Sequence, residues 1–320
     1  MRGSEVCQAG LGPRVILGCI DIGSNTTRLL VAEADRGALR ELTADRVFTC
    51  IRKSLDGEGC IPGEKIAETV DVVCAQAAAA RDLGAQEIVA VATAAIRDAP
   101  NRAELEEGVR DGCGLELRVI PGQEEARLSF VGATETLPEP AQGKVAVVDV
   151  GGGSTEIAVG SSGEAVHWWT SLPIGSGVLA DRYLISDPPG TSEVEAVRRQ
   201  VADTFEGIAV PTVDGAVAVG GTATALMQVL DSALDHETLE RGIALVSTSP
   251  VDVLAAQLGL DPERVRVLPA GILVLQAVAD RLGPLQIACG GLREGVILEL
   301  AEALSPAPPA PSARADGAAP

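Results

Sequence analysis

The sequence predicts an α/β protein of two duplicated domains, on three observations. A segment of strand, glycine-rich turn and strand occurs twice, strand-like and helix-like stretches alternate along the chain, and 320 residues suffice for two ordinary cores. We expect residues 1–137 and 138–304 to form one domain each. Residues 138–143 (PEPAQG) are expected to be a linker, and the Pro/Ala-rich tail 305–320 to be disordered.

In the first half, runs of β-branched and aliphatic residues predict strands, and a long Ala-rich amphipathic stretch predicts a helix. The predicted strands are 14–20, 28–34, 38–43, 87–91 and 116–120, and the predicted helices are 63–83, 101–110 and 123–135. Strands that alternate with helices are typical of an α/β domain.

The second half repeats this alternation. The predicted strands are 144–150, 154–160, 164–170, an apolar strand just before Gly220, and 285–289; the predicted helices are 191–207, 221–231, 262–282 and 293–304. The chain therefore has two successive α/β halves.

An internal repeat relates the openings of the two halves. CIDIGSNTTRLLVAE at 19–33 and VDVGGGSTEIAVG at 148–160 align without a gap at an offset of 128 residues. Asp21 then falls on Asp149, and Arg28 falls on Glu156. Such a duplication predicts two domains related by a pseudo-twofold axis, with their turns facing one another.

Each turn has the composition of a phosphate cradle. An acid ends a buried strand, glycines let backbone N–H groups converge on an anion, and hydroxyls add donors. Two purely structural hairpins are the alternative, but they do not explain why both copies keep the acid and the hydroxyls. The acids lack the second Asp, two residues on, that an aspartyl nucleophile of the haloacid dehalogenase type has, so we interpret them as ligands for metal-bound water. The candidate residues are Asp21, Gly23, Ser24, Asn25, Thr26, Asp149, Gly151, Gly152, Gly153, Ser154 and Thr155.

A third glycine turn follows an apolar strand in the second half. Gly220, Gly221 and Thr222 open a predicted helix, whose N-terminus would face an anion, although a tight strand–helix junction is an alternative. The P-loop sequence GxxxxGK[ST] is absent. The segment 174–180 (IGSGVLA) matches a nicotinamide-binding pattern weakly and lacks its surrounding unit, so we reject a nicotinamide site.

Composition excludes several classes of function. The net charge of −20 repels polyanions at long range and argues against nucleic-acid binding, so any phosphate site must be local. Two histidines, His167 and His236, are too few for a His-based triad or zinc site.

Seven cysteines without a CxxC pair predict reduced packing residues. Without a signal pattern or an apolar run of about 20 residues, we expect a cytoplasmic protein that binds no membrane.

Several longer motifs resemble one family closely. They are VATAAIRDAPNR at 91–102, VIPGQEEARLSF at 119–130, SLPIGSG at 171–177, SDPPGTSEV at 186–194 and CGGLREGVI at 289–297. From about residue 14 to 303 the chain resembles the exopolyphosphatase / guanosine pentaphosphatase (Ppx/GppA) family. This resemblance implies two actin-like (ribonuclease H-like) α/β domains, as in the sugar kinase/Hsp70/actin superfamily.

The resemblance also implies roles for individual residues. Glu125 would be the catalytic base, with Glu124 as the alternative if the register is off by one, and bound phosphates would raise its pKa. Asp149 and Glu156 would hold Mg²⁺ or Mn²⁺. Arg97 would bind the scissile phosphoryl oxygens through its fixed guanidinium. The catalytic residues would thus be Glu125, Arg97 and Asp149. Arg264 would contact the rest of the substrate.

These roles predict hydrolysis of the terminal phosphoanhydride of inorganic polyphosphate. The alternatives are 5′-phosphohydrolysis of pppGpp, a ppGpp-binding regulator that does not turn over, and a kinase or ATPase chaperone of the same superfamily. Longer relatives carry a further helical region after the LREG segment, so we expect the highest kcat/KM on short polyphosphates. The sequence leaves a homodimer open.

Overall fold

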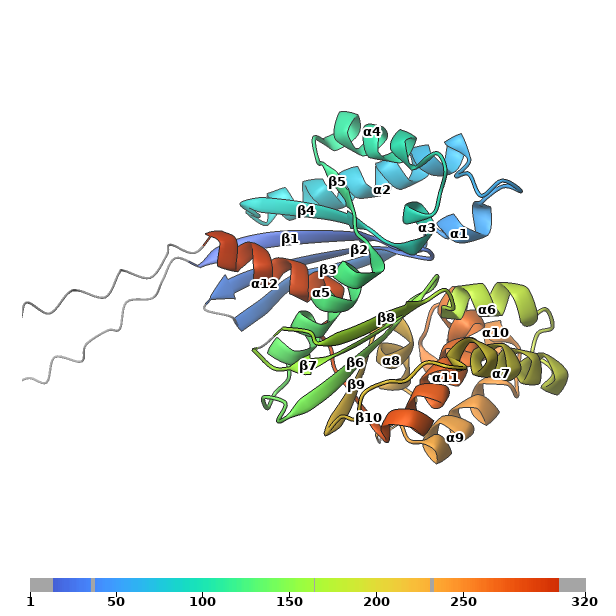
Figure 1. Ribbon diagram of the computed structural model, residues 1–320. Coiled ribbons are helices and arrows are strands. Elements are labelled where there is room, and N and C mark those ends of the chain that lie inside the picture. The colour runs from blue at the N-terminus through green and yellow to red at the C-terminus, as the bar shows by residue number, and fades with distance from the viewer. Residues whose placement is uncertain (1–13, 36–37, 164, 231–232, 305–320) are drawn as a thin grey trace, which may run out of the picture.

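The computed structural model describes residues 14–35, 38–163, 165–230 and 233–304, so the predicted tail 305–320 lies outside the described residues. Two five-stranded sheets lie one beyond the other in Figure 1, with helices between them and further helices on the outer side of each sheet. The division at residues 137 and 138 stays a prediction. No helix in the described part of the chain is long and apolar enough to cross a membrane.

The first sheet has the strand order β3-β2-β1-β4-β5. β1 pairs antiparallel with β2 and parallel with β4, and β4 pairs parallel with β5. The strands are β1 Val15–Ile22, β2 Thr27–Asp35, β3 Ala38–Val47, β4 Glu87–Ala92 and β5 Leu117–Val119.

The second sheet has the order β10-β9-β6-β7-β8. Read from the opposite edge, this is the order of the first sheet with five added to each strand number. β6 pairs antiparallel with β7 and parallel with β9. The strands are β6 Lys144–Val150, β7 Thr155–Ser161, β8 Trp168–Leu172, β9 Gly215–Val219 and β10 Leu285–Ile287. The repeat in the sequence is therefore a repeat of the whole sheet topology.

Helices α2 (Gly63–Asp82) and α4 (Arg102–Cys113) cover the outer face of the first sheet. Val73, Ala77 and Ala80 of α2 are fully buried, and their spacing of four and three residues puts them on one helix face. Helices α1 (Ile51–Ser54) and α3 (Ala94–Arg97) are single turns.

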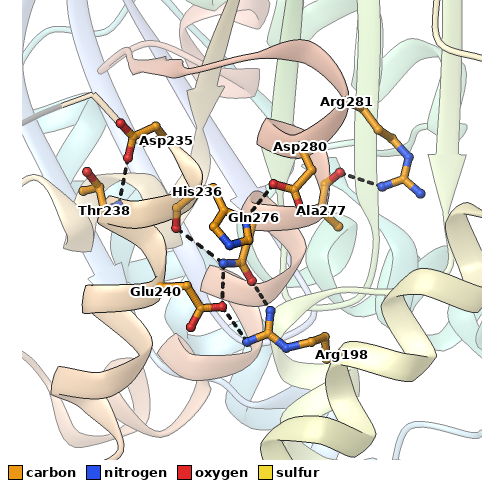
Figure 2. Close-up of polar contacts among 9 residues, drawn as sticks. All are labelled: Arg198, Asp235, His236, Thr238, Glu240, Gln276, Ala277, Asp280 and Arg281. Carbon is orange, nitrogen blue, oxygen red and sulfur yellow. Dashed lines mark hydrogen bonds and ion pairs between the residues drawn. The ribbon is translucent and has the colours of Figure 1, made fainter.

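On the outer side of the second sheet, α11 (Pro262–Leu282) packs on β6 and β9, and α7 (Thr191–Phe205) and α9 (His236–Val246) pack on α11. Figure 2 shows the polar side chains that join them: Arg198 of α7 donates to Glu240 of α9 at 2.8 Å, and Gln276 of α11 donates to the same carboxylate at 2.8 Å. His236 contacts Asp280 at 2.8 Å. These residues hold helices together. Shorter helices complete this half: α6 Ser176–Tyr183, α8 Gly220–Leu226 and α10 Val251–Leu258.

Two helices lie between the sheets, and each packs on the sheet of the other half. α5 (Gly122–Glu135) packs on β6, β7 and β8, whereas α12 (Leu292–Leu304) packs on β1 and β2. The two helices also cross closely: a Cβ at Gly132 of α5 would collide with the carbonyl oxygen of Gly291, just before α12, and a Cβ at Gly295 of α12 would collide with that of Leu128 in α5. The crossing joins the halves without side chains between the two backbones.

Most predicted elements have counterparts with bounds shifted by a few residues, but several helices were missed. The missed helices are α1, α3, α6, α9 and α10. α1 and α3 have four residues each and cannot show helical periodicity. The strand predicted at 164–170 is β8 at Trp168–Leu172, because antiparallel pairing with β7 places Thr155 opposite Leu172. The helix predicted at 221–231 ends at Leu226, and residue 231 is not described.

Candidate active site

A pocket opens where the turns of the two halves meet. Its walls come from the β1–β2 turn, the β6–β7 turn, and the starts of α3, α5, α8 and α12. The described residues that line it include Asp21, Gly23, Ser24, Asn25, Thr26, Arg28, Thr93, Ala94, Glu125, Asp149, Gly151, Gly152, Gly153, Ser154, Ser176, Gly220, Gly221, Arg264, Gly290, Gly291, Arg293 and Glu294.

The two turns are built alike. The N–H of Gly23 donates to the carbonyl of Thr26 at 2.9 Å, and the N–H of Gly151 donates to the carbonyl of Ser154 at 3.0 Å. The amides of residues 24–26 and 152–154 meet no acceptor within the described ranges. Each turn thus closes on itself and keeps a set of amides for another acceptor.

A neighbouring helix start takes up the carbonyls of each turn. In the first half, Arg52 donates its N–H to the carbonyl of Ser24 at 3.0 Å. In the second half, the N–H of Ser176 donates to Gly151 at 2.9 Å, and that of Gly177 donates to Gly152 at 3.0 Å. Because the carbonyls are paired on the far side, the free amides give both turns a positive face, as an anion requires.

The turns face one another across the pocket. A Cβ at Gly153 would collide with the hydroxyl of Ser24, and a Cβ at Gly152 would lie 3.3 Å from the Cβ of Asn25. The absence of a side chain at Gly153 leaves room for the side chain of Ser24 from the opposite turn. A phosphate chain between the turns would be reached from both halves.

Beside the two turns, the hairpins carry different charges at the same register position. Asp21 of β1 lies opposite Arg28 of β2, and Asp149 of β6 lies opposite Glu156 of β7. The gapless alignment is therefore also the alignment in space. The first hairpin therefore carries a carboxylate opposite a guanidinium, and the second hairpin carries two opposed carboxylates.

Glu125 lies in the pocket, whereas Glu124 does not. Glu125 is 8 % exposed and accepts a hydrogen bond from Arg97 at 3.1 Å. Burial, followed by the charge of Glu156, raises the pKa of Glu125 well above its usual value, although Arg97 opposes the shift. Glu124 instead pairs with Arg127 at 2.8 Å, and that bond lowers its pKa. Burial, not the negative charge that the sequence suggested, is thus the largest cause of the raised pKa of Glu125.

The acids of the second hairpin are each held by a serine. Ser129 of α5 donates to Oδ2 of Asp149 at 2.7 Å, and Ser171 of β8 donates to Oε1 of Glu156 at 2.7 Å. Burial raises the pKa of Glu156 to about 7, and it also raises the pKa of Asp149. The hydrogen bond from each serine acts in the opposite direction, since it favours the charged form.

Asp21 has one oxygen without a partner. Its Oδ1 atom is buried and meets no donor among the described residues. Burial raises the pKa of Asp21 to about 6, although Arg28 and Arg293 lower it. Buried carboxylate oxygens normally find a donor or a cation, so this oxygen indicates a ligand in the pocket.

The carboxylates of the pocket suit a divalent cation that takes only part of its ligands from the protein. Within the described ranges, no three His, Cys, Asp or Glu side chains form a ready-made metal cluster. A cation held by a full cage of protein ligands, such as structural zinc, therefore does not fit. Mg²⁺ uses one or two carboxylates and completes its shell with water and phosphate, and Asp149 with Glu156 could supply those two.

Some predicted phosphate ligands do not present their side chains to the pocket. The hydroxyl of Thr155 donates to the carbonyl of Ile174 at 2.6 Å, and this residue is fully buried. Thr222 packs behind the pocket wall, where a Cβ at Gly271 would collide with its hydroxyl. Arg97 and Glu156 are not among the described lining residues, but each lies beside one, Glu125 and Asp149 respectively.

Unpaired arginines surround the first hairpin. Arg28 lies opposite Arg46 of β3, and Arg264 of α11 is 8 % exposed. Among the described residues, none of the three side chains has an ion pair or hydrogen bond, and Arg264 makes only a cation–π contact with Phe48 at 6.0 Å. Burial lowers the pKa of Arg28 to about 9 and that of Arg264 to about 10.

Comparison with known proteins decides the family. Residues 30–304 match the profile of the Ppx/GppA phosphatase family. The chain belongs to this family. It is 31 % identical over 308 residues to exopolyphosphatase 1 of Mycobacterium tuberculosis (strain ATCC 25618 / H37Rv), with 88 % of this chain and 87 % of that relative covered.

A second relative carries a different name. The chain is 28 % identical over 298 residues to the guanosine-5′-triphosphate,3′-diphosphate pyrophosphatase of Aeromonas hydrophila, where 88 % of this chain but only 58 % of the relative is covered. Among solved structures, the Ppx/GppA family member of Aquifex aeolicus has a TM-score of 0.77 and 27 % identity, covering 92 % of this chain and all of that one (100 %). The predicted family and the duplicated actin-like α/β fold are confirmed.

Sequence reasoning assigned no role to two parts of this Ppx/GppA pocket. Ser176 belongs to the family motif at 171–177 and to the rejected nicotinamide pattern, and neither gave it a role of its own. Its neighbouring glycines serve the β6–β7 turn, since a Cβ at Gly175 would lie 2.5 Å from the carbonyl carbon of Gly152. Arg293 at the start of α12 donates to the carbonyl of Leu29 at 3.0 Å. The LREG segment was noticed only as a family motif, and its spacing alone does not show that it reaches the opposite half.

Proposed function

We propose that this Ppx/GppA phosphatase is an exopolyphosphatase, which hydrolyses the terminal phosphoanhydride of inorganic polyphosphate and releases orthophosphate. The observation that carries the proposal is the meeting of two amide-rich turns with a buried carboxylate, Glu125, in one pocket. The turns suit a chain of phosphates, and the carboxylate suits a general base.

In this proposal Glu125 takes a proton from a water molecule, and the water oxygen attacks the end phosphoryl group in line. The bond to the bridging oxygen breaks, and the shortened polyphosphate leaves. A raised pKa makes Glu125 a better proton acceptor than an ordinary carboxylate near neutral pH. Arg97 orients Glu125 through the 3.1 Å hydrogen bond and is the candidate for binding the scissile phosphoryl oxygens.

The second hairpin would hold the cation. Mg²⁺ or Mn²⁺ bound at Asp149 and Glu156 would supply positive charge that neutralises the phosphoryl oxygens in the transition state. The amides of both turns would hold the remaining oxygens. Asp21, Ser24, Asn25 and Thr26 would complete the cradle from the first half, facing Gly220 and Gly221 from the second.

The surroundings of the pocket support polyphosphate over a nucleotide. Arg28, Arg46 and Arg264 offer unpaired positive charge next to the cradle, as further phosphates require. None of the described lining residues is aromatic, so a guanine base would find no ring to stack on. The larger shared coverage is with relatives named exopolyphosphatase.

Hydrolysis of pppGpp at its 5′ end is the second candidate function. The Aeromonas relative is named for that substrate, and the same residues would perform the reaction. A ppGpp-binding regulator that does not turn over is less well supported, because Glu125 and both acids of the second hairpin are in place. A cytoplasmic location and a homodimer stay predictions.

A phosphate-release assay separates these functions. Polyphosphates of several lengths, pppGpp and ATP are each incubated with the protein in Mg²⁺, in Mn²⁺ and in excess EDTA. We expect the highest kcat/KM on polyphosphate and no turnover in EDTA. Faster turnover of pppGpp would favour the second function, binding of ppGpp without any turnover would favour the regulator, and full activity in EDTA would remove the cation role of Asp149 and Glu156.

A further inference from the structure

Two serines that the proposed mechanism does not use hold its two acidic cation ligands. Ser129 donates to Oδ2 of Asp149, and Ser171 donates to Oε1 of Glu156, both at 2.7 Å. Ser129 is only 1 % exposed, so its hydroxyl is shielded from solvent. The serines come from different elements, α5 and β8, yet each binds one oxygen of one acid.

Helix α5 links these contacts to the proposed base. Gly122, Glu125 and Ser129 are spaced by three and four residues, so they lie on one face of the helix. A Cβ at Gly122 would lie 2.7 Å from the Cβ of Ser171. One helix face therefore contacts the serine that holds Glu156, carries the base, and supplies the donor to Asp149.

The other oxygen of Asp149 lies at the pocket wall. A Cβ at Gly220, a residue that lines the pocket, would lie 2.5 Å from Oδ1 of Asp149. Ser129 therefore occupies the oxygen on the α5 side and leaves the oxygen on the pocket side. A carboxylate with one oxygen fixed loses little further freedom when its second oxygen binds a cation.

We propose that Ser129 and Ser171 are positioning residues that set the affinity of the pocket for its divalent cation. The inference rests on the proposed function, because it takes Asp149 and Glu156 as the cation ligands. Hydrogen-bond partners of metal-binding carboxylates typically change metal affinity by about 10- to 100-fold. A purely structural role would change thermal stability and leave cation binding as it is.

The test measures Mn²⁺ binding without substrate, from the electron paramagnetic resonance signal of free Mn²⁺. Ser129→Ala and Ser171→Ala should each raise the dissociation constant about tenfold or more. At saturating Mn²⁺ their kcat should return to near the wild-type value, because the base is untouched. Ser171→Thr keeps a hydroxyl and should bind Mn²⁺ like the wild type.

The matched control is Thr134→Val, which deletes another buried hydroxyl of α5. That hydroxyl donates to the carbonyl of Phe130 at 2.9 Å and faces no carboxylate, so Mn²⁺ binding should not change. If the wild type binds Mn²⁺ and both folded alanine variants bind it equally well, the inference is overturned while the proposed function stands. If the wild type binds no Mn²⁺ and hydrolyses polyphosphate in EDTA, the cation assignment fails, and the inference fails with it. Should Ser129→Ala not fold, the more exposed Ser171 gives an independent result.

Discussion

The β1–β2 hairpin and the β6–β7 hairpin share the geometry of their turns and differ in charge at a register position beside the turn. In the first, Asp21 lies opposite Arg28; in the second, Asp149 lies opposite Glu156. The turns close with the same hydrogen bond, and each has its carbonyls bound by a neighbouring helix start. The backbone of the cradle is thus common to both halves, while one side chain decides whether a half presents a cation or a second acid.

This difference suggests a division of work between the halves. The first hairpin, with Arg28, Arg46 and Arg264 around it, favours anions and suits substrate binding. The second hairpin, with α5 packed on its sheet, gathers the carboxylates and suits the chemistry. The predictions below test this division.

The largest effect should come from the base. Glu125→Gln keeps the shape of the side chain but cannot take a proton, so we expect kcat to fall by about two to four orders of magnitude. Polyphosphate binding, measured by equilibrium titration, should stay nearly unchanged, because the cradle amides and arginines remain.

Glu124→Gln is the matched control for that variant, since Glu124 pairs with Arg127 outside the pocket. Its kcat should stay within a few-fold of the wild type. A near-normal rate for Glu125→Gln together with a large loss for Glu124→Gln would assign the base to the other glutamate.

A smaller effect, on stability, should come from Asp21. Its pKa is raised from 3.8 to about 6 in the folded state, so above about pH 6 folding keeps a buried charge that the unfolded chain holds in water. In EDTA and phosphate-free buffer at pH 7, Asp21→Asn should therefore be more stable than the wild type, by up to about 3 kcal/mol. As the pH falls through 6 towards 4, the folded protein binds a proton at Asp21 and the advantage of the variant should shrink.

Thermal denaturation of both proteins across this pH range checks the sign. A variant that is less stable than the wild type at pH 7 would show that attraction between Arg28 and Asp21 outweighs burial. The first hairpin would then contain a stabilising ion pair, and its arginine would be less available to substrate.

The smallest effect should come from Arg28. Arg28→Gln removes one charged donor from the first hairpin, so KM for polyphosphate should rise about tenfold, as expected for a hydrogen bond to a charged group. The value of kcat should change little if the hairpin only binds substrate, and Arg28→Lys should fall between the two. Steady-state kinetics measure both constants, and a fall in kcat at constant KM would contradict the division of work.

Much of this arrangement could be predicted from the sequence, because the signals were local or repeated. The strands flanking both turns are largely apolar runs. The gapless repeat also shows from the sequence alone that Arg28 and Glu156 occupy equivalent positions, and the strand registers agree with it. Glu125 required the family resemblance, since a glutamate in a first helical turn is common for reasons unrelated to catalysis.

What could not be predicted depends on contacts between distant segments. No local pattern indicates that Ser129 reaches Asp149, that Ser171 reaches Glu156, or that Arg293 reaches the carbonyl of Leu29. The phosphate role predicted for Thr155 assumed that every hydroxyl of the turn faces the anion. In the structure that hydroxyl donates to the carbonyl of Ile174, a contact that a sequence pattern does not show.

The crossing of α5 and α12 bears on how the chain is made. The inner face of the first sheet is covered by α12, at residues 292–304, so its apolar residues, Leu17, Leu30 and Val91 among them, stay uncovered until a segment about 200 residues further along the chain is synthesised. At about 5 to 20 residues per second, translation of the intervening 200 or so residues takes on the order of tens of seconds. Throughout that interval the nascent first half exposes an apolar sheet face, and we expect a chaperone that binds apolar surfaces to shield it on the ribosome.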